Sequence, residues 1–497
     1  MHLNQEMLMK LNFLFFFLLS FSCTVAALIE RAHLAGSWYP KDKEKLIQDL
    51  DQYFSLAAKK FPVKKQQNVN ALIVPHAGYR YSGLCAASAY QTIKNKPFER
   101  VIIIGPDHGR SFYGIALPDY TSYETPLGLI PADTDAVNML AQTKTIFKEI
   151  PNIWKPEHSV EIQLPFLQAS LQNFSIVPLI TGKLTEQQFT TAAKQLGKLV
   201  NDGKKTLIVV SSDFIHYGKK YRYTPGIENA KKFDTQAIKA IVNESYKDFN
   251  EVITKTGATI CGKDGIKLLL KAIELNTFGH ANCDLVCFYN SKQITGNQLE
   301  ENFVSYAGIV CASNLTLKEE QALLKLAKLT ITEKLFPETK KTTDWFVPTK
   351  NMEKPLGLFV TLKTKDGKLR GCIGRITTDQ PLYKAVQAMA QAAAFHDSRF
   401  APLQKNELPD IKLSITILSA PKPAASYKDI VLGKHGIILE KDGKTAVYLP
   451  QVAKEQKWNR TQTLQSLSQK AGLAKNAWKN AHFKVFEGFE FGEKHPL

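Results

Sequence analysis

The chain has 497 residues, and 44% of them are hydrophobic, which is enough apolar material for roughly two or three domains that fold without disulfide staples. The formal net charge of +18 at pH 7 is compatible with a nucleic-acid partner, but the lysines are scattered and no arginine-aromatic module is present. Composition therefore excludes a small disulfide-dependent scaffold and favours a solvated basic surface, and we expect no nucleic-acid partner.

Residues 1–27 have the pattern of an export signal. Lys10 precedes the apolar stretch LNFLFFFLLSF, whose length fits the core of a signal peptide and is too short to span a bilayer comfortably. Small residues up to Ala27 predict cleavage before Leu28, which gives a periplasmic or secreted protein, whereas lipidation of Cys23 gives a membrane-tethered lipoprotein. The protein stays cytoplasmic if this segment is not a functional signal.

Seven cysteines are few for a chain of this length, and their spacing is not that of a disulfide framework. The motif CDLVC is a weak zinc signal, because three residues separate its thiols and no second pair matches it. Cys283 and Cys287 are therefore interpreted as residues of a core strand. The other cysteines after the leader are candidates for individual roles: Cys85, Cys261, Cys311 and Cys372.

The predicted elements between residues 70 and 314 alternate between strands and helices. Four apolar runs end in Gly, Pro, Asp or His, which is typical of buried strands in a parallel or mixed sheet. Segments between them, such as TEQQFTTAAKQLGKLVND, have the period of a helix. The alternation predicts an α/β domain over residues 28–314. The four runs are NALIVPHAGY, RVIIIGPDHG, FSIVPLITG and KTLIVVSSDFIHYG.

The pattern changes near residue 315. The segment LTLKEEQALLKLAKLTITEKLF predicts one amphipathic helix, and Thr316 and Glu319 form a capping box at its start. Strand-like pieces separated by helices follow it, an arrangement typical of an α+β domain over residues 315–497. These pieces are LGLFVTLKT, LRGCIGRI, IKLSITILS and KTAVYLP.

Polar residues follow the strands of the first domain, where an open α/β sheet binds its ligands. His76 follows the first run, Asp107 and His108 the second, and Asp213 and His216 the fourth. Between them, PEHSVEIQLPF places His158 and Glu161 one helical turn apart. Each histidine taken alone fits a capping or hydrogen-bonded role. Several of them at one edge favour a shared site instead.

A divalent metal suits this set of residues. A neutral imidazole offers a nitrogen lone pair, and a carboxylate such as Asp213 orients the ring through its other N–H. Cys261 precedes Gly262 at the start of a predicted helix, where the positive end of the dipole lowers the pKa of a thiol. A thiolate completes a soft site for copper, iron or zinc. The alternative for Cys261 is a buried cysteine at a helix start.

The motifs of the first domain resemble those of the Memo family, also called AmmeMemoRadiSam system protein B, over nearly all of residues 31–312. This resemblance implies an α/β fold like that of class III extradiol dioxygenases. It implies metal ligands at His76, His108 and Cys261, with the other polar residues, His158, Asp213 and His216, lining the same pocket. The motifs are HLAGSWYP, VPHAGYRYSG, GPDHG, EHSVEIQLPF, SSDFIHYG, TICGKDG and SYAGIV.

Two positions depart from the animal members of that family. Gly109 stands where those members carry a second histidine after the one that matches His108, and Gln163 replaces another histidine. Both departures leave the implied ligands in place, but they weigh against a signalling role of the animal type.

The second domain is similar to the AMMECR family, AmmeMemoRadiSam system protein A, over roughly residues 316–497, in LRGCIGRI, AFHDSRFAPL, GKHGIIL and VYLPQVA. Cys372 lies between two glycines, and Arg370 beside it favours ionisation of the thiol. His396 and Asp397, with Arg399, form a candidate polar cluster near it, although Cys372 also fits a core strand. Proteins of this system accompany a radical S-adenosylmethionine protein, which is therefore an expected partner.

The leading hypothesis is a metal-dependent oxidoreductase or dioxygenase-like enzyme that uses iron or copper, with zinc less favoured. His158 or His216 serves as the general acid or base beside Asp213. The pocket walls include Tyr79, Tyr81 and Glu161. The alternatives are a non-catalytic protein that binds a small molecule or peptide in this cleft and docks a partner through the second domain, and a zinc hydrolase.

Overall fold

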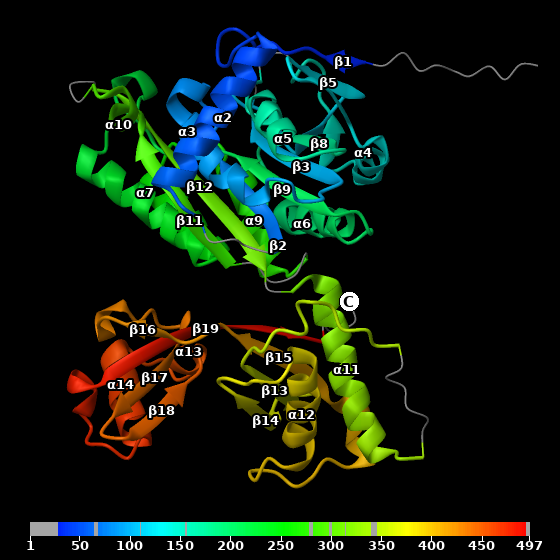
Figure 1. Ribbon diagram of the computed structural model, residues 1–497, viewed down its shortest axis with the longest axis vertical. Helices are drawn as coiled ribbons and strands as arrows, with labels where there is room; N and C mark the ends of the chain where they lie inside the picture. Colours follow the sequence, from blue (N-terminus) through cyan, green and yellow to red (C-terminus); the bar gives the residue numbers. More distant parts are fainter. Residues whose placement is uncertain are drawn as a thin grey trace, which may run out of the picture.

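The computed structural model describes residues 28–493 except 64–67, 110, 155–156, 278–281, 298–300, 314 and 339–344. The predicted export signal, with Cys23 and Ala27, lies outside the described residues. Two regions follow each other along the chain: a first region up to residue 313 and a second region from residue 315 (Figure 1). Within the described residues, no helix has both the length and the apolar character needed to cross a membrane.

A mixed nine-stranded sheet forms the centre of the first region, in the order β10-β12-β2-β9-β3-β8-β4-β7 with β11 beside β12. The four strands from β2 to β8 run parallel and are buried on both faces, which is why they read as continuous apolar runs in the sequence. Next to β2, the long strand β12 runs antiparallel both to β2 and to β11. The bounds are β2 (Asn68–Val74), β3 (Arg100–Pro106), β8 (Ser175–Thr181), β9 (Thr206–Ser211), β11 (Asn282–Asn290) and β12 (Phe303–Ser313).

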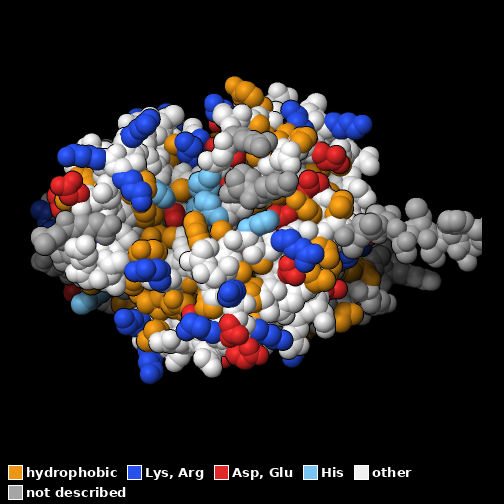
Figure 2. Space-filling model, turned by 90° about the horizontal axis from the view of Figure 1, so that it is seen from above, with side chains coloured by type: hydrophobic (Ala, Val, Ile, Leu, Met, Phe, Trp, Pro, Cys, Tyr) orange, Lys and Arg blue, Asp and Glu red, His pale blue; other side chains and the backbone are white. Residues whose placement is uncertain are grey.

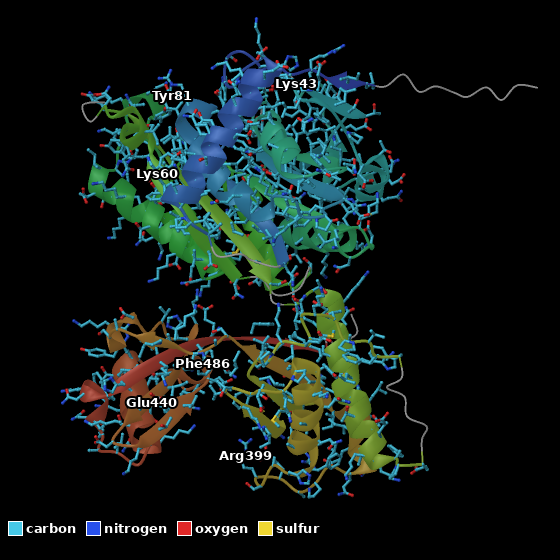
Figure 3. All side chains as sticks on the ribbon, viewed as in Figure 1. Lys43, Lys60, Tyr81, Arg399, Glu440 and Phe486 are labelled. Atoms are coloured by element: carbon cyan, nitrogen blue, oxygen red, sulfur yellow. A yellow bond between two sulfur atoms is a disulfide. The ribbon has the colours of Figure 1, made fainter. Side chains whose placement is uncertain are left out.

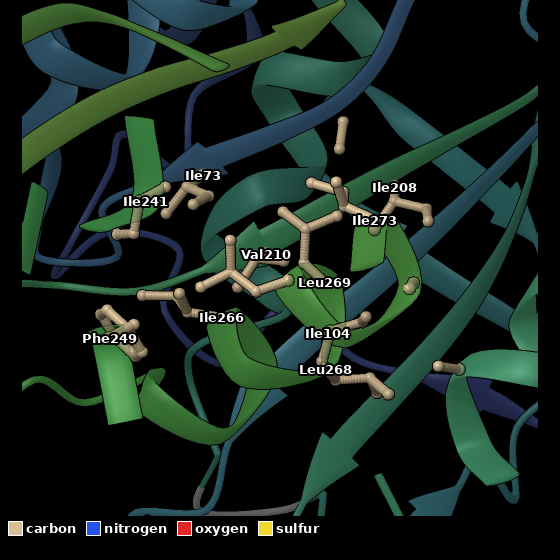
Figure 4. Close-up of a cluster of buried hydrophobic side chains, with 14 of the residues drawn as sticks. Ile73, Ile104, Ile208, Val210, Ile241, Phe249, Ile266, Leu268, Leu269 and Ile273 are labelled. Carbon is tan, nitrogen blue, oxygen red and sulfur yellow. The ribbon is translucent and has the colours of Figure 1, made fainter. Parts of the chain in front are cut away.

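Helices cover both faces of this sheet (Figure 1). One apolar core lies between the sheet and the helices α2 (Lys43–Lys60), α3 (Tyr79–Tyr90) and α5 (Leu164–Ser170). The other lies beneath α6 (Glu186–Val200), α7 (Ile227–Val242), α8 (Tyr246–Thr256) and α9 (Lys263–Glu274), and Figure 4 shows residues of β2, β3 and β9 packed there against α7, α8 and α9. The α/β prediction is therefore confirmed.

Short elements complete the first region. Three of its strands form a small separate sheet in the order β1-β5-β6. The bounds are β1 (Ile29–Glu30), β4 (Ile115–Leu117), β5 (Ser122–Thr125), β6 (Gly128–Pro131), α4 (Thr134–Ala141), β7 (Phe147–Glu149), β10 (His216–Tyr217) and α10 (Ser291–Thr295).

The second region is an antiparallel seven-stranded sheet with helices, as the α+β prediction requires. Its strands are ordered β14-β13-β15-β19-β17-β18, with β16 beside β19. The last strand, β19, pairs with β15 through one half and with β17 through the other, so it joins two apolar cores. The strands are β13 (Leu358–Lys363), β14 (Leu369–Arg375), β15 (Lys412–Leu418), β16 (Lys422–Ala424), β17 (His435–Lys441), β18 (Lys444–Tyr448) and β19 (His482–Gly492), and the helices are α11 (Leu317–Leu335), α12 (Leu382–Phe395), α13 (Val452–Glu455) and α14 (Arg460–Lys470).

One disulfide joins β11 to β12. Cys283 and Cys311 lie directly opposite each other in the register of these strands and are bonded. Cys283 and Cys287 are both buried in a strand, as expected. The expectation that Cys311 has a role of its own is wrong, because Cys311 is bonded to Cys283. Only the register of the hairpin brings the two thiols together, because 28 residues separate them along the chain.

Candidate metal centre

A large cleft opens at the carboxyl ends of the parallel strands. His76 follows β2, His108 follows β3, and Asp213 and His216 follow β9, and all four line one cavity of about 1020 Å³ together with His158. Figure 2 shows histidine side chains gathered in a hollow of this face. The sequence therefore predicted correctly that these residues meet at one edge of the sheet.

Three of the histidines converge on a single point. The ligand atoms of His76, His108 and His158 all lie within 4.8 Å of one another. The ring centroids are 5.0 Å apart for His76 and His108, and 4.2 Å apart for His108 and His158. A transition metal binds imidazole nitrogen at about 2.0–2.1 Å, so one ion between the three rings is within reach of each of them after small side-chain adjustments.

His76 presents a bare nitrogen lone pair to this point. Its Nδ1 lies 3.1 Å from Ser211 Oγ, and the Ser211 hydroxyl donates its own hydrogen to the carbonyl oxygen of Ser159 at 2.6 Å. Ser211 Oγ therefore accepts from His76 Nδ1–H, which leaves the lone pair on Nε2. His76 is 1% exposed, and its Nε2 has no hydrogen-bond partner among the described residues.

Neighbouring groups hold the neutral ring of His76 in place. Burial first, and the charge of His108 second, lower the pKa of His76 well below its usual value, so the ring is uncharged at neutral pH. The backbone N–H of His76 donates to Asp213 Oδ1 at 2.8 Å. Gln163, one of the departures from the animal pattern, donates to Ser211 Oγ at 2.9 Å and to the carbonyl oxygen of Pro75 at 3.0 Å. Gln163 thus fixes the position of the Ser211 hydroxyl that contacts His76 Nδ1.

Glu157 orients His108, a role that was not predicted from the sequence. Its carboxylate accepts the His108 backbone N–H at 2.9 Å, the His108 Nδ1–H at 3.0 Å and the Ser159 N–H at 2.7 Å. Burial alone raises the pKa of Glu157, but the hydrogen bond and charge of His108 outweigh it and lower the pKa to about 2. The carboxylate is thus ionised and fixes His108 Nε2 as the free ligand atom. The position of Glu157 directly before His158 is the feature of the sequence that could have indicated this role.

His158 completes the group of three. Its ring stacks on that of His108 and lies 4.6 Å, centroid to centroid, from Trp38. Burial, followed by the positive charges of His76 and His108, lowers the pKa of His158 to about 3. Its imidazole is therefore neutral at physiological pH, the state that a metal ligand requires.

Cys261 lies beside His216 and is not part of the group of three histidines. Its Sγ is 3.7 Å from His216 Nε2 and 3.8 Å from His216 Nδ1. Burial first, then the negative charges of Asp213 and Glu157, raise the pKa of this thiol well above its usual value. The expectation that a helix start lowers this pKa is therefore wrong, because burial beside two carboxylates outweighs the dipole of α9. The ligand role of Cys261 stays a prediction.

Asp213 and His216 form a second polar pair in the cleft. His216 Nδ1 faces the carbonyl oxygens of Phe214 at 3.0 Å and Thr259 at 3.2 Å, so Nδ1 carries the hydrogen and Nε2 is the acceptor. Burial raises the pKa of Asp213, and the charge of His216 opposes that rise. The pair offers one proton acceptor and one carboxyl group beside the three histidines.

The predicted pocket walls divide into two groups. Tyr81 and Tyr79 line the cleft, and the buried Tyr79 hydroxyl donates to the carbonyl oxygen of Ile162 at 2.9 Å. Glu161 does not contact the cleft. Its carboxylate accepts the backbone N–H of Leu34 at 2.8 Å and the hydroxyl of Tyr39 at 2.6 Å, so it holds the N-terminal segment in place. The reason is local: the helical turn begins only at Glu161, so His158 and Glu161 do not share a helix face.

The second region gathers part of its predicted site around Cys372 of β14. Asp397 accepts the backbone N–H of Cys372 at 2.8 Å, and Arg399 donates both to Asp397 at 2.8 Å and to the carbonyl oxygen of Cys372 at 3.0 Å. Arg370 does not contact the thiol and instead forms a two-point ion pair with Glu407, at 2.7 and 3.0 Å. The prediction that Arg370 favours ionisation of the Cys372 thiol is therefore not supported by a contact between the two side chains.

The remaining features of this region are structural in origin. His396 is the residue that ends α12. Gly371 is required by packing, because a Cβ there would lie 2.1 Å from the carbonyl oxygen of Ala393 in α12. The hydrogen bond of Arg399 holds the pKa of Asp397 far below its usual value. These residues fasten β14 to the end of α12.

The two candidate sites lie at opposite ends of the molecule: Figure 3 shows Arg399, which contacts Cys372, at the end of the second region that is far from the first region. Asn68, at the start of β2, pairs with Ser313, where the chain passes to the second region, so the amino ends of the parallel strands face the junction. The metal cleft is at the carboxyl ends of these strands and opens on the face that Figure 2 shows. Among the described residues, those that line this cleft all come from the first region.

The chain is similar to several known proteins. The memo-1 homologue of Caenorhabditis elegans is 32% identical over 250 residues, which cover 48% of this chain and 70% of that protein. A MEMO1 family protein of Archaeoglobus fulgidus is 31% identical over 279 residues, which cover 56% of this chain and 97% of that protein. The solved structure of the uncharacterized protein PH0010 from Pyrococcus horikoshii is 28% identical, covers 37% of this chain and 96% of its own, and has a TM-score of 0.33.

Family models match both regions. The model described as AMMECR1 matches residues 324–491. The model described as Memo-like protein matches residues 30–310, which is more than half of the chain. The chain therefore belongs to the Memo family and carries an AMMECR1 domain after its Memo domain.

Proposed function

We propose that the Memo domain is a metal-dependent, oxygenase-like redox protein that binds one iron or copper ion in its cleft. The observation that carries this proposal is the buried Nε2 of His76, which has a lone pair and no hydrogen-bond partner among the described residues. Burying an unpaired polar atom costs about 1–3 kcal/mol, and an ion removes that cost. His108 and His158 supply the other two nitrogens of the site.

The neighbouring residues support chemistry on a small organic substrate. The bound ion supplies a redox centre and a Lewis acid. The space beside the histidines is walled by Trp38, Tyr81 and Tyr306, which suits a compact apolar substrate. His216 Nε2 accepts a proton from the bound substrate, while Asp213 keeps His76 fixed through its backbone N–H. Cys261, which the family resemblance implies as a ligand, becomes a thiolate only when a cation offsets the two nearby carboxylates.

Metal analysis of the full-length protein, purified without chelators or metal-affinity steps, tests this function. We expect about one ion of iron or copper per chain, loss of that ion in His76→Gln, and retention in His33→Gln. His33 is a matched control in the same domain, because its side chain is 49% exposed and lies 3.2 Å from Glu30. Oxygen uptake by the reduced, metal-loaded protein in the presence of candidate substrates then tests the redox assignment. A metal-free native protein would contradict the proposal.

A ligand-binding protein without catalysis is the second candidate, because the cavity of about 1020 Å³ with aromatic walls suits recognition as well as chemistry. The two functions differ in their dependence on His76. If the native protein carries no metal and His76→Gln weakens ligand binding without abolishing it, the binding function is supported.

We also propose that the protein works outside the cytoplasm, with a radical S-adenosylmethionine protein as a partner of the same system. The disulfide between Cys283 and Cys311 supports the first point, because disulfides persist mainly in oxidising compartments. The family resemblance supports the second. Cell fractionation followed by alkylation of free thiols tests the location, and copurification tests the partner.

A further inference from the structure

A second cavity lies at the junction between the Memo and AMMECR1 domains, at the opposite end of the sheet from the metal cleft. It has a volume of about 350 Å³. Three of its walls come from the Memo domain: the start of β2, the loop before β3 and the loop between α6 and β9. The fourth wall is the start of α11, the helix that packs against α12 in the second region (Figure 1).

The walls of this junction cavity are strongly basic. Among the described residues that line it, four are lysines and none is an aspartate or glutamate. Lys204 is neutralised by Asp133, 2.9 Å away. Within the part of the chain that the structure describes, the ammonium groups of Lys205 and Lys318 have no carboxylate within ion-pair distance. Lys205 belongs to the Memo domain, and Lys318 lies on α11, which packs into the core of the second region. Two like charges therefore line one space across the junction, and the Glu99 carboxylate beside them accepts the backbone N–H of Lys205 at 2.9 Å.

The floor of the same cavity is apolar. Val69 is 3% exposed and Phe98 is 9% exposed, and both line the cavity with Pro97 and Val200. Asn70 donates one hydrogen bond to Ser313 Oγ at 3.2 Å, which ties this side of the cavity to the end of β12. A plain inorganic anion matches the lysines alone, whereas an anion attached to an apolar body matches both the lysines and the floor.

We propose that the junction cavity binds a small organic phosphate, whose anionic group bridges Lys205 and Lys318 and whose apolar part rests on Val69 and Phe98. The bound anion replaces repulsion between the two domains with attraction to both of them. It therefore fixes the Memo domain against the AMMECR1 domain. This site is independent of the metal cleft.

Phenylphosphonate is the probe for this site, because it joins a doubly charged group to an apolar ring and resists hydrolysis. Calorimetric titration of the full-length protein should show binding that weakens as salt rises. Inorganic phosphate should bind more weakly, because it leaves the apolar floor uncovered. Each of Lys205→Gln and Lys318→Gln should weaken phenylphosphonate binding about five-fold, and the double variant should abolish it.

Lys194→Gln is the matched control, because Lys194 is an exposed lysine of α6 that does not line the cavity. It should bind like the unmodified protein, and circular dichroism should show that all variants fold. Limited proteolysis between the domains should slow when phenylphosphonate is added to the unmodified protein but not to the double variant. Unchanged binding by the double variant, equal affinity for inorganic phosphate, or no binding at all would overturn the proposal.

Discussion

Replacing Glu157 by glutamine removes one negative charge and one hydrogen-bond acceptor from behind the candidate metal centre. The carboxylate accepts three N–H groups, two from His108 and one from Ser159. An amide oxygen accepts at most two of them, and the amide NH₂ then faces a donor. His108 is thus left without the anion that fixes its tautomer and orientation.

The size of the effect follows from the pKa of Glu157. Burial raises this pKa, but the hydrogen bond and charge of His108 outweigh burial and lower it from 4.5 to about 2. Each pKa unit corresponds to about 1.4 kcal/mol, so the net stabilisation of the ionised carboxylate is on the order of 3 kcal/mol. Only part of this free energy depends on the bound ion. We therefore expect Glu157→Gln to weaken metal binding between about 10-fold and 100-fold, the range usual for residues that orient a ligand.

Competition titration with a chromophoric chelator measures this change. Glu161→Gln is the matched control, because Glu161 is a buried glutamate of the same segment that holds the N-terminal segment rather than a histidine. It should reduce the stability of the protein and leave metal affinity nearly unchanged. Equal metal affinity in the Glu157 variant and the unmodified protein would refute the reasoning that Glu157 orients His108.

Three further predictions concern pH, the thiol and the disulfide. Burial lowers the pKa of His108, but the hydrogen bond and charge of Glu157 outweigh burial and raise it, so protons compete with the metal for this ligand. Metal affinity should be full above the raised pKa and should fall as the pH drops through it. Metal titrations at several pH values measure this change. Cys261→Ser should lower copper affinity about ten-fold more than zinc affinity, because a soft sulfur ligand is lost, and an equal loss for both metals would contradict a thiolate ligand. Replacing Cys283 and Cys311 by serine opens a link between residues 28 apart and should cost about 3–4 kcal/mol of unfolding free energy in urea; an unchanged midpoint would show that the link contributes nothing.

The architecture and the gathering of the histidines could be predicted from the linear pattern of residues. Buried parallel strands must be apolar along their whole length, so β2, β3 and β9 were visible as runs, and the residues that end such strands meet at one edge because the strands run in the same direction. His76, His108 and Asp213 could therefore be placed together before their distances were known.

Properties that depend on neighbours distant along the chain could not be predicted in this way. Glu157 was overlooked because its role requires the loop before α5 to fold back onto the end of β3. The pKa of Cys261 is raised rather than lowered, because burial and two nearby carboxylates outweigh the helix dipole. The disulfide required the register of β11 on β12. A linear pattern records the period of each element, whereas tautomers, charge states and cross-strand pairs are set by contacts that only the packed chain creates.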